Sequence, residues 1–269
     1  MKQLRSSSQD LRKLFEHGIN VRHVVEELQC CRADENVTVV GARMKKDDFD
    51  VLGIQEGGVV YGYVERAKLK SGLCGQYQQT FHPSELIAES TPLIDLLPIL
   101  RDKPRVFVLD RNRVNGIVTR GDLPKAPVRL LLFGLVTLLE MQLLRLVRIY
   151  YHQDSWQEHI KAERLAAAKK LHAERQSRNE AIDLADCLQF CDKRELVLKK
   201  PELLERMQFK SKMSGEHLLK EAEKLRDKLA HAQDIVTGSS WPEVIDLATE
   251  IEALLGRCEQ FDGQPSFTS

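Results

Sequence analysis

The sequence changes its pattern at two prolines, Pro124 and Pro127, and this change limits the possible folds more than any other feature. Before the prolines, short apolar segments alternate with glycine-bearing turns, which is typical of a small α/β unit. After them, apolar residues recur at helical spacing up to Gly256, and proline itself is favoured in the first turn of a helix. The sequence therefore predicts an α/β module followed by an all-α module.

Length and composition agree with two globular domains. The chain has 269 residues, and one core usually serves roughly 100–150 residues before a chain subdivides. With 42% hydrophobic and 30% charged residues, there are enough apolar side chains to form packed cores. We expect domains at residues 1–125 and 126–260, and a flexible tail at residues 261–269.

Charge and cysteine content exclude several classes of function. Forty Lys and Arg residues balance forty Asp and Glu residues, so any attraction to nucleic acid must be local. The six cysteines form no CxxC pair and have no partnering histidine spacing, so we expect reduced thiols and no metal site. The N-terminal segment MKQLRSSSQDLRKLFEHG lacks the apolar core of a secretory signal, and we expect a cytoplasmic protein.

One segment, residues 128–151, is apolar enough to be compared with a membrane span. Glu140, Gln142, Arg145 and Arg148 interrupt it. Ionisable side chains near the centre of a bilayer are costly, whereas a helix buried in a bundle tolerates a few of them at its rim. We therefore expect a buried helix of the rear module, and no membrane partner.

The front half contains an internal repeat of roughly 50 residues. In each copy a turn joins two strands, and the turn of the first copy is Gly57-Gly58. Both copies close with a strand glycine, apolar residues and a leucine, as GYVERAKL and GIVTRGDL. The expected elements are a helix over 21–31, a strand over 38–43, a hairpin centred on Gly57-Gly58, a helix over 93–100, and strands over 105–109 and 114–119.

The segment GIVTRGDL resembles the closing motif of a cystathionine β-synthase (CBS) domain, and the repeat resembles a tandem CBS module of βαββα type over residues 1–125. In this family the Thr and the Asp of the motif typically face an adenosine nucleotide. These residues are Thr119 and Asp122. The resemblance implies a regulatory adenine nucleotide or related adenosyl ligand, such as ATP, ADP, AMP or S-adenosylmethionine (SAM).

Two interpretations of this motif stay open. A carboxylate can accept protons from two ribose hydroxyls, and a hydroxyl at a helix start adds a donor near a phosphate. Thr119 and Asp122 can instead be an ordinary helix N-cap and first-turn carboxylate. In the first copy Glu65 and Lys68 stand at the corresponding positions, so we expect at most one competent nucleotide site.

The rear half contains the segment LRDKLAHA on a predicted amphipathic helix. Its Arg226, Asp227 and His231 resemble the signature of the HEPN superfamily, four-helix domains that are frequently metal-independent endoribonucleases. Spacing alone is weak evidence, because Arg12 and His17 share it. The polar second residue and the helical context strengthen the match. The resemblance implies a HEPN-like bundle of four to five helices with Arg226 and His231 in its catalytic site.

Cleavage of RNA without a metal needs a proton acceptor, a proton donor and positive charge near the phosphorane oxygens. A histidine with a pKa near 6.5 suits proton transfer, and an arginine keeps its charge and can contact two phosphate oxygens. One Arg–His pair cannot fill every role, and in the HEPN family two copies of the motif share one cleft. The resemblance therefore implies a homodimer, in which Asp227 orients Arg226 or His231. Glu140 is either a further polar partner or an exposed carboxylate.

The combined hypothesis is a toxin, stress or defence effector: an endoribonuclease that binds RNA and is regulated by a nucleotide, with an antitoxin or inhibitor chain as a further candidate partner. The alternative is a non-catalytic regulatory or dimerisation protein, in which Arg226 and His231 hold a ligand or simply face solvent. Helices are expected over 128–153, 156–191 with a break near Ser177, 201–207, 215–235 and 242–255. Six basic residues form a predicted loop-rich stretch that either contacts RNA or is solvated: Lys193, Arg194, Lys199, Lys200, Lys210 and Lys212.

Overall fold

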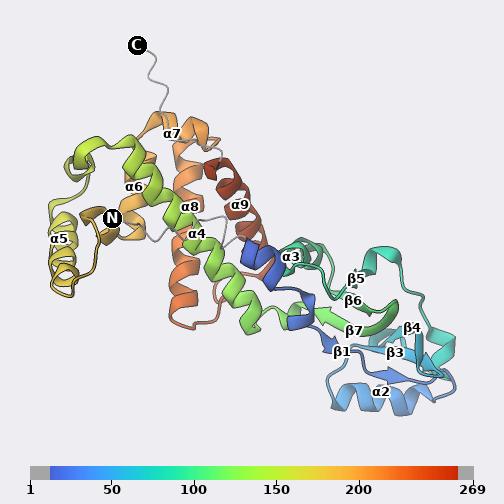
Figure 1. Ribbon diagram of the computed structural model, residues 1–269. Helices are drawn as coiled ribbons and strands as arrows, with labels where there is room; N and C mark the ends of the chain where they lie inside the picture. Colours follow the sequence, from blue (N-terminus) through green and yellow to red (C-terminus); the bar gives the residue numbers. More distant parts are fainter. Residues whose placement is uncertain (1–12, 260–269) are drawn as a thin grey trace. The chain divides into compact units, whose positions relative to one another are not determined.

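The computed structural model describes residues 13–259 (Figure 1). Its contacts divide the chain into two compact units, one from Leu14 to Val128 and the other beginning at Arg129. The division lies in the first turn of helix α4 (Ala126–Tyr150), three residues after the expected boundary. The front unit is mixed α/β and the rear unit is helical, as predicted. The predicted tail at 261–269 lies outside the described residues.

The front unit contains a three-stranded sheet of order β2-β3-β4 and a four-stranded sheet of order β1-β7-β6-β5. The strands are β1 (Glu26–Glu27), β2 (Cys30–Cys31), β3 (Val51–Glu56), β4 (Val59–Glu65), β5 (Leu86–Ala88), β6 (Arg105–Asp110) and β7 (Arg113–Thr119). Helix α2 (Val37–Lys46) connects β2 to β3, and helix α3 (Leu93–Asp102) connects β5 to β6. In both β-α-β-β units the first two strands are parallel and the last two are antiparallel.

The backbone confirms the internal repeat. A β-bulge follows Ile54 in β3, and the corresponding bulge follows Val108 in β6, 54 residues later. The 3-10 turns after the closing strands, η3 (Arg66–Lys68) and η6 (Arg120–Asp122), have the same separation. Further short helical turns are η1 (Leu14–Gly18), η2 (Val21–His23), η4 (Cys74–Tyr77) and η5 (Pro83–Glu85).

The two copies of the repeat exchange their leading segments. Strand β1 of the first copy pairs with the closing strand of the second, with Glu26 opposite Ile117. In return, Gln79 of the segment that leads into the second copy bridges to Tyr63 of the closing strand of the first. Tyr63 and Ile117 occupy the same position of the repeat. Each copy therefore contributes a backbone segment that pairs with the closing strand of the other copy: strand β1 in one case, and the single bridge of Gln79 in the other.

This exchange requires the strand glycine that precedes each paired position. A Cβ at Gly62 would overlap the carbonyl oxygen of Gln79, and a Cβ at Gly116 would overlap the side chain of Val25. Because glycine has no Cβ, the crossing segment can approach the strand closely at both places. The glycine shared by the two closing motifs is thus explained by packing.

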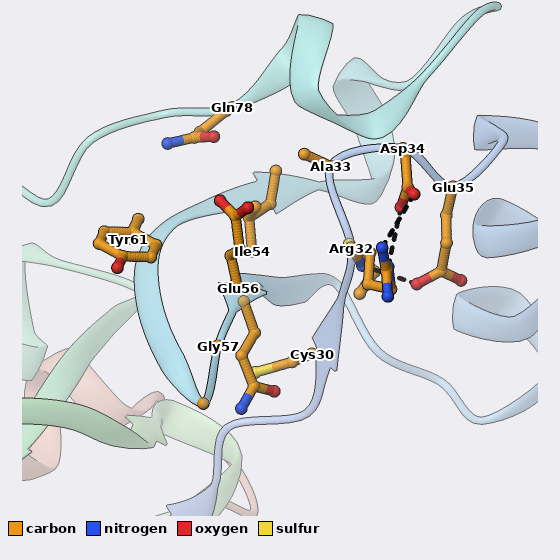
Figure 2. Close-up of a pocket in the computed structure, with 13 residues that line it drawn as sticks. Cys30, Arg32, Ala33, Asp34, Glu35, Ile54, Glu56, Gly57, Tyr61 and Gln78 are labelled. Carbon is orange, nitrogen blue, oxygen red and sulfur yellow. Dashed lines mark hydrogen bonds and ion pairs between the residues drawn. The ribbon is translucent and has the colours of Figure 1, made fainter.

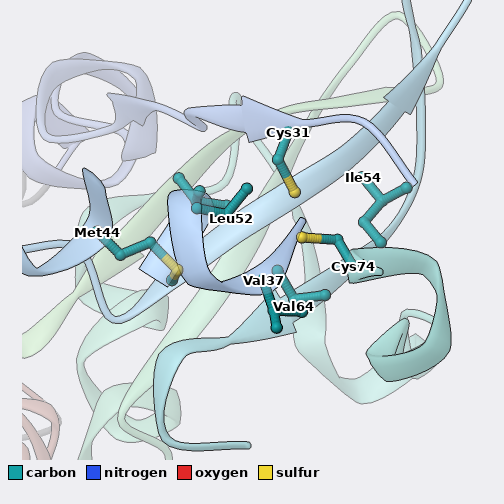
Figure 3. Close-up of a cluster of buried hydrophobic side chains, with 8 residues drawn as sticks. Cys31, Val37, Met44, Leu52, Ile54, Val64 and Cys74 are labelled. Atoms are coloured by element: carbon teal, nitrogen blue, oxygen red, sulfur yellow. The ribbon is translucent and has the colours of Figure 1, made fainter. Parts of the chain in front are cut away.

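Helix α2 packs on the sheet of the first copy through one face. Val37, Val40 and Met44 are buried at helical spacing, and together with side chains of the sheet they form a core (Figure 3). The thiols of Cys31 and Cys74 point toward each other in this core (Figure 3). Burial and the neighbouring Cys74 thiol raise the pKa of Cys31 to about 12, so this thiol stays protonated at neutral pH.

Two predictions for the first copy are wrong. Residues 38–43, expected as a strand because of their β-branched side chains, belong to α2. Asn36 caps this helix by accepting a hydrogen bond from the Thr38 N–H at 2.8 Å. Residues 21–31, expected as a helix, form η2 and the short strands β1 and β2. Their partners β7 and β3 lie far away in the sequence, so local periodicity does not reveal the pairing.

The rear unit continues from α4 with η7 (His152–His159), α5 (Ala162–Gln176), η8 (Leu184–Cys187), α6 (Phe190–Leu198), α7 (Pro201–Arg206), α8 (Lys212–Ala230) and α9 (Trp241–Glu259). The helix expected over 156–191, with a break near Ser177, is only partly correct, because η7, α5, η8 and the start of α6 occupy this range. Its predicted break near Ser177 marks the end of α5, and the left-handed Asn179 (φ 58°) follows. Helix α6 is buried on almost every side, although it carries four ionisable residues between Asp192 and Glu195.

Among the described helices, α4 alone is long and apolar enough to cross a membrane by length and hydropathy. In the structure, 61% of its most apolar window is buried. A core helix of a folded bundle satisfies the same two criteria.

The crossing at Gly62 generates a stability prediction. We expect Gly62→Ala to lower the free energy of unfolding by roughly 2–3 kcal/mol, because the added methyl group forces the Gln79 backbone away from β4. Gly41→Ala is the matched control, since a Cβ at this position in α2 meets nothing within 4 Å. It should raise stability by up to about 1 kcal/mol through helix propensity. Denaturant titration of both variants measures the difference, and equal effects would contradict the crossing.

Candidate functional sites

A cleft of about 510 Å³ opens in the front unit where the leading segment of the first copy crosses the closing strand of the second. Thr119 and Asp122 line it, beside Glu26, Glu27 and the segment Asp48–Val51. The structure thus places both residues of the predicted nucleotide motif in a concave site. The exchange of leading segments creates this cleft.

Within the cleft, Thr119 and Asp122 make the contacts of a helix cap. The backbone N–H and the hydroxyl of Thr119 donate to Asp122 Oδ2 at 2.7 and 3.0 Å. The Thr119 hydroxyl also accepts from the Gly121 N–H at 3.1 Å. Lys125 Nζ lies 2.8 Å from Asp122 Oδ1. These contacts agree with the interpretation of Thr119 and Asp122 as an ordinary helix N-cap and first-turn carboxylate. A ligand at Asp122 therefore has to add to these contacts or displace Lys125.

Carboxylates dominate the charge of this cleft. Its lining holds five carboxylates and two guanidinium groups, and both arginines already donate to protein acceptors. Arg120 donates to the carbonyl oxygens of Leu100 and Arg101 at 2.8 and 2.7 Å, and Arg105 pairs with Glu65. Lys125 pairs with Glu26 and Asp122, and Arg66 pairs with Asp48 and Asp50, so only a small excess of negative charge is left to repel an anionic ligand.

In the first copy, the position of Thr119 is taken by Glu65, which is held in ion pairs. Arg105 and Lys68 both contact its carboxylate, the latter at 3.1 Å. Arg105 also lies over the rings of Tyr63 and Phe107, at 5.3 and 6.0 Å from their centroids. Burial raises the pKa of Glu65, but hydrogen bonds from Lys68 and Arg105 outweigh it and hold the pKa below its usual range. The expectation of at most one competent nucleotide site stays a prediction.

A larger hollow of about 760 Å³ lies between the β2–α2 turn and the β3–β4 hairpin (Figure 2). Arg32 is held there by Asp34 at 2.9 Å, and the Arg32 backbone N–H donates to Glu35 at 2.6 Å. Tyr61 and Gln78 lie on the opposite side (Figure 2). None of the predicted nucleotide-binding or catalytic residues lines this hollow, although the Gly57-Gly58 turn does.

In the rear unit, three of the four predicted catalytic residues come together. Arg226 on α8 lies 3.6 Å from Glu140 on α4 and 2.8 Å from the adjacent Asp227. Its guanidinium also lies 5.5 Å from the ring centroid of Phe190 on α6. Burial lowers the pKa of Arg226, but Asp227 and Glu140 outweigh it and hold the pKa above its usual range. Glu140 was expected to be either a polar partner in the site or an exposed carboxylate. In the structure it is partly buried and pairs with Arg226.

Lys193 is a fourth charged member of this cluster, and its place there was not predicted. Lys193 Nζ lies 2.7 Å from Glu140, and Arg194 pairs with Glu223 of α8. Both were expected in a loop-rich surface stretch, and that prediction is wrong, because their side chains are only 7% and 10% exposed on α6. The apolar residues on every side of LQFCDKRELVL are the signal that could have indicated a buried helix.

His231, the fourth predicted catalytic residue, lies at the end of α8. It is the C-cap of this helix, is exposed, and donates its backbone N–H to the Asp227 carbonyl at 3.1 Å. Within residues 13–259, no hydrogen bond or ion pair joins the side chains of His231 and Arg226. Within one chain, therefore, Arg226 and His231 do not form a pair. Arg226 instead belongs to a charge-balanced cluster with the cation Lys193 and the carboxylates Glu140 and Asp227.

No family model and no curated protein sequence matches the chain. Similar solved structures include an uncharacterised conserved protein from Pyrococcus horikoshii, with 15% identity, a TM-score of 0.36, and coverage of 40% of this chain and 90% of that one. CBSX2 in complex with AMP has 17% identity, a TM-score of 0.36, and coverage of 42% and 98%. The CBS domain of a bacterial CNNM/CorC family Mg²⁺ transporter in complex with ATP has 14% identity, a TM-score of 0.36, and coverage of 45% and 94%.

The ion pairs of Glu65 generate a pH-dependent prediction. The pKa of Glu65 is lower in the folded state than in the unfolded chain, so its stabilisation is present above about pH 5 and is lost as pH falls through the folded pKa. Glu65→Gln should lower the free energy of unfolding by about 1 kcal/mol at pH 7, since water still reaches the pair. The difference from wild type should shrink toward pH 3 in denaturant titrations. Exposed Glu56→Gln is the control and should show no such trend.

Proposed function

We propose that the protein is a nucleotide-regulated endoribonuclease, in which a tandem CBS module precedes a HEPN-like domain that cleaves RNA as a homodimer. The observation that carries this proposal is the convergence of Glu140, Arg226 and Asp227. Glu140 and Arg226 are 86 residues apart in the sequence, and the sequence indicates each of them independently as a candidate. The repeated β-α-β-β units and the cleft at Thr119 and Asp122 support the regulatory part.

The burial of charge in the rear unit also supports a functional site. Removing a cation such as Lys193 from water costs several kcal/mol, and well-packed apolar side chains often serve stability equally well. Lys193 and Arg194 are buried on α6, and each needs a carboxylate of another helix as partner. Polar clusters that are costly for stability are found preferentially at functional sites.

The residues have distinct chemical roles in the proposed reaction. His231 is exposed at a helix end, where its imidazole can take the proton of the 2′-hydroxyl or donate one to the leaving oxygen. Arg226 offers its guanidinium to the phosphorane oxygens. Asp227 and Glu140 position Arg226, and Lys193 in turn holds Glu140. Attack by the 2′-oxygen leaves a 2′,3′-cyclic phosphate on one product.

Cleavage assays with purified full-length protein test this proposal. We expect cleavage of single-stranded or transfer RNA in the presence of EDTA, with cyclic phosphate ends. Arg226→Ala and His231→Ala should each lower the rate at least ~100-fold, since each removes a transition-state contact or a proton carrier. Arg178→Ala and His217→Ala are matched controls, because both residues are exposed and lie outside the cluster. Intact RNA across added nucleotides, or equal effects of all four variants, would contradict the proposal.

One observation favours a second candidate, a non-catalytic regulatory or dimerisation protein. Arg226 is already held by Glu140 and Asp227, so the cluster carries no excess positive charge for a phosphate. In this case Arg226→Ala lowers the stability of the rear unit, because Glu140 loses a partner, while RNA stays intact with every variant. The cleavage assay separates the two candidates, and thermal unfolding of the same variants shows whether a lost activity reflects lost stability.

The acidic lining of the front cleft favours an adenosyl ligand with little negative charge. Asp122 can accept ribose hydroxyls, but a triphosphate would meet the surrounding carboxylates. Within the proposed ligand class, AMP and S-adenosylmethionine therefore suit the cleft better than ATP.

Calorimetry with adenosine, AMP, ATP and S-adenosylmethionine tests the ligand class. We expect AMP to bind more tightly than ATP, and the ligand that binds to raise the melting temperature by mass action. Asp122→Asn should weaken binding at least tenfold, about the effect of losing one charged hydrogen bond. Asp34→Asn, in the other hollow, is the control. The absence of a thermal shift with all four compounds would indicate a purely structural front unit.

A further inference from the structure

Helix α4 carries an apolar stripe that is exposed to solvent. Leu130, Phe133 and Met141 are large apolar side chains that are 55%, 40% and 37% exposed. Thr137 and Leu144, both partly buried, lie on the same side of the helix. We call these five residues the α4 stripe. Contiguous exposed apolar side chains on a folded domain indicate an interaction surface.

The spacing of the α4 stripe is symmetric about its centre. The intervals along the sequence are three, four, four and three residues, with Thr137 in the middle. With 3.6 residues per turn, all five side chains project within about 40° of the Thr137 direction. The Thr137 hydroxyl donates to the Phe133 carbonyl at 2.8 Å, so its hydrogen bond is satisfied inside the helix. The stripe can therefore be covered without leaving its one polar donor unpaired.

We propose that a second copy of this chain covers the α4 stripe, with the two α4 helices antiparallel across a two-fold axis at Thr137. In this register Leu130 of one copy faces Leu144 of the other, and Phe133 faces Met141. An isologous interface requires this self-complementarity, because the same patch serves both partners. The symmetric spacing favours a second copy as the occupant, since each side chain of the stripe then meets a stripe residue of the other copy. The inference rests on the proposed function and specifies its dimer.

The register determines where the two charged clusters lie. Glu140 projects about 60° to one side of the stripe, three residues or about 4.5 Å along the helix from Thr137. A two-fold axis that lies in the interface and is perpendicular to both helices keeps that side unchanged. Both Glu140 residues therefore reach the same edge of the interface, with an offset of about 9 Å along the helix direction. Each brings its Arg226, so the dimer supplies the second copy of the site.

Light scattering and sedimentation of the full-length protein test the interface. We expect a particle of twice the 30.8 kDa chain mass at micromolar concentration. Phe133→Lys or Met141→Glu alone should raise the dimer dissociation constant at least about 30-fold, the effect of removing an interface hot spot. Leu171→Lys and Met213→Glu are matched controls, because these side chains are 42% and 78% exposed on other helices. Both controls should remain dimers.

The antiparallel register makes a stronger prediction. The double variant Phe133→Lys/Met141→Glu should recover the dimer, since each new lysine faces a new glutamate of the other copy. A mixture of the two single variants should likewise form the mixed dimer. Far-UV circular dichroism confirms that each variant is folded. The inference is overturned by a monomeric wild type, by an unchanged dimer in the single variants, or by failure of the double variant to recover.

The results also separate this inference from the proposed function. A dimer that follows the predicted register but leaves RNA intact overturns the endoribonuclease and supports the interface. Cleavage by a dimer that Phe133→Lys and Met141→Glu leave intact overturns the interface and supports the endoribonuclease. If the interface and the endoribonuclease are both correct, Phe133→Lys should lower the cleavage rate together with dimerisation. The double variant should then recover the dimer and the cleavage activity.

Discussion

The exchange of leading segments between the two copies of the repeat determines the architecture of the front unit. Strand β1 completes the sheet of the second copy, and Gln79 bridges to the closing strand of the first. The two closing-motif glycines permit this approach, and the cleft at Thr119 exists because the segments cross there. A β-α-β-β unit by itself would expose the edge of its closing strand and leave one wall of the cleft missing.

Much of this fold could be predicted where the signal is local. The glycine turn, both hairpins, helix α3 and the division near Pro124 follow from turn chemistry and periodicity. The predictions of secondary structure are wrong where contacts between distant segments of the chain determine the conformation. Residues 21–31 have helical periodicity but pair with strands, and Thr38-Val39-Val40 favours a strand but buries one face of a helix. Neither partner surface can be read from the segment itself.

The candidate sites show the same division. Short sequence motifs indicate Thr119, Asp122, Arg226 and His231 as candidates, whereas for Glu140 the sequence leaves a polar partner and an exposed carboxylate both open. In the structure Glu140 lies 3.6 Å from Arg226. For Lys193 the sequence predicts a loop, because a run of charged residues normally indicates a solvent-exposed segment, yet its side chain is only 7% exposed. Its position opposite Glu140 results from the packing of α6 against α4 and α8, which no single segment encodes. The paired state of Arg226 likewise requires three helices and could not be inferred from spacing.

The pairing of Glu26 with Ile117 also has a consequence during synthesis. The two residues are separated by 91 positions, so β1 leaves the ribosome long before its partner strand exists. Until β7 is made, the nascent chain carries an unpaired edge and only one wall of the cleft. The front unit can thus complete its second sheet only after its last strand, β7, has emerged. Formation of the cleft at Thr119 is in this way delayed until the whole duplicated module is complete.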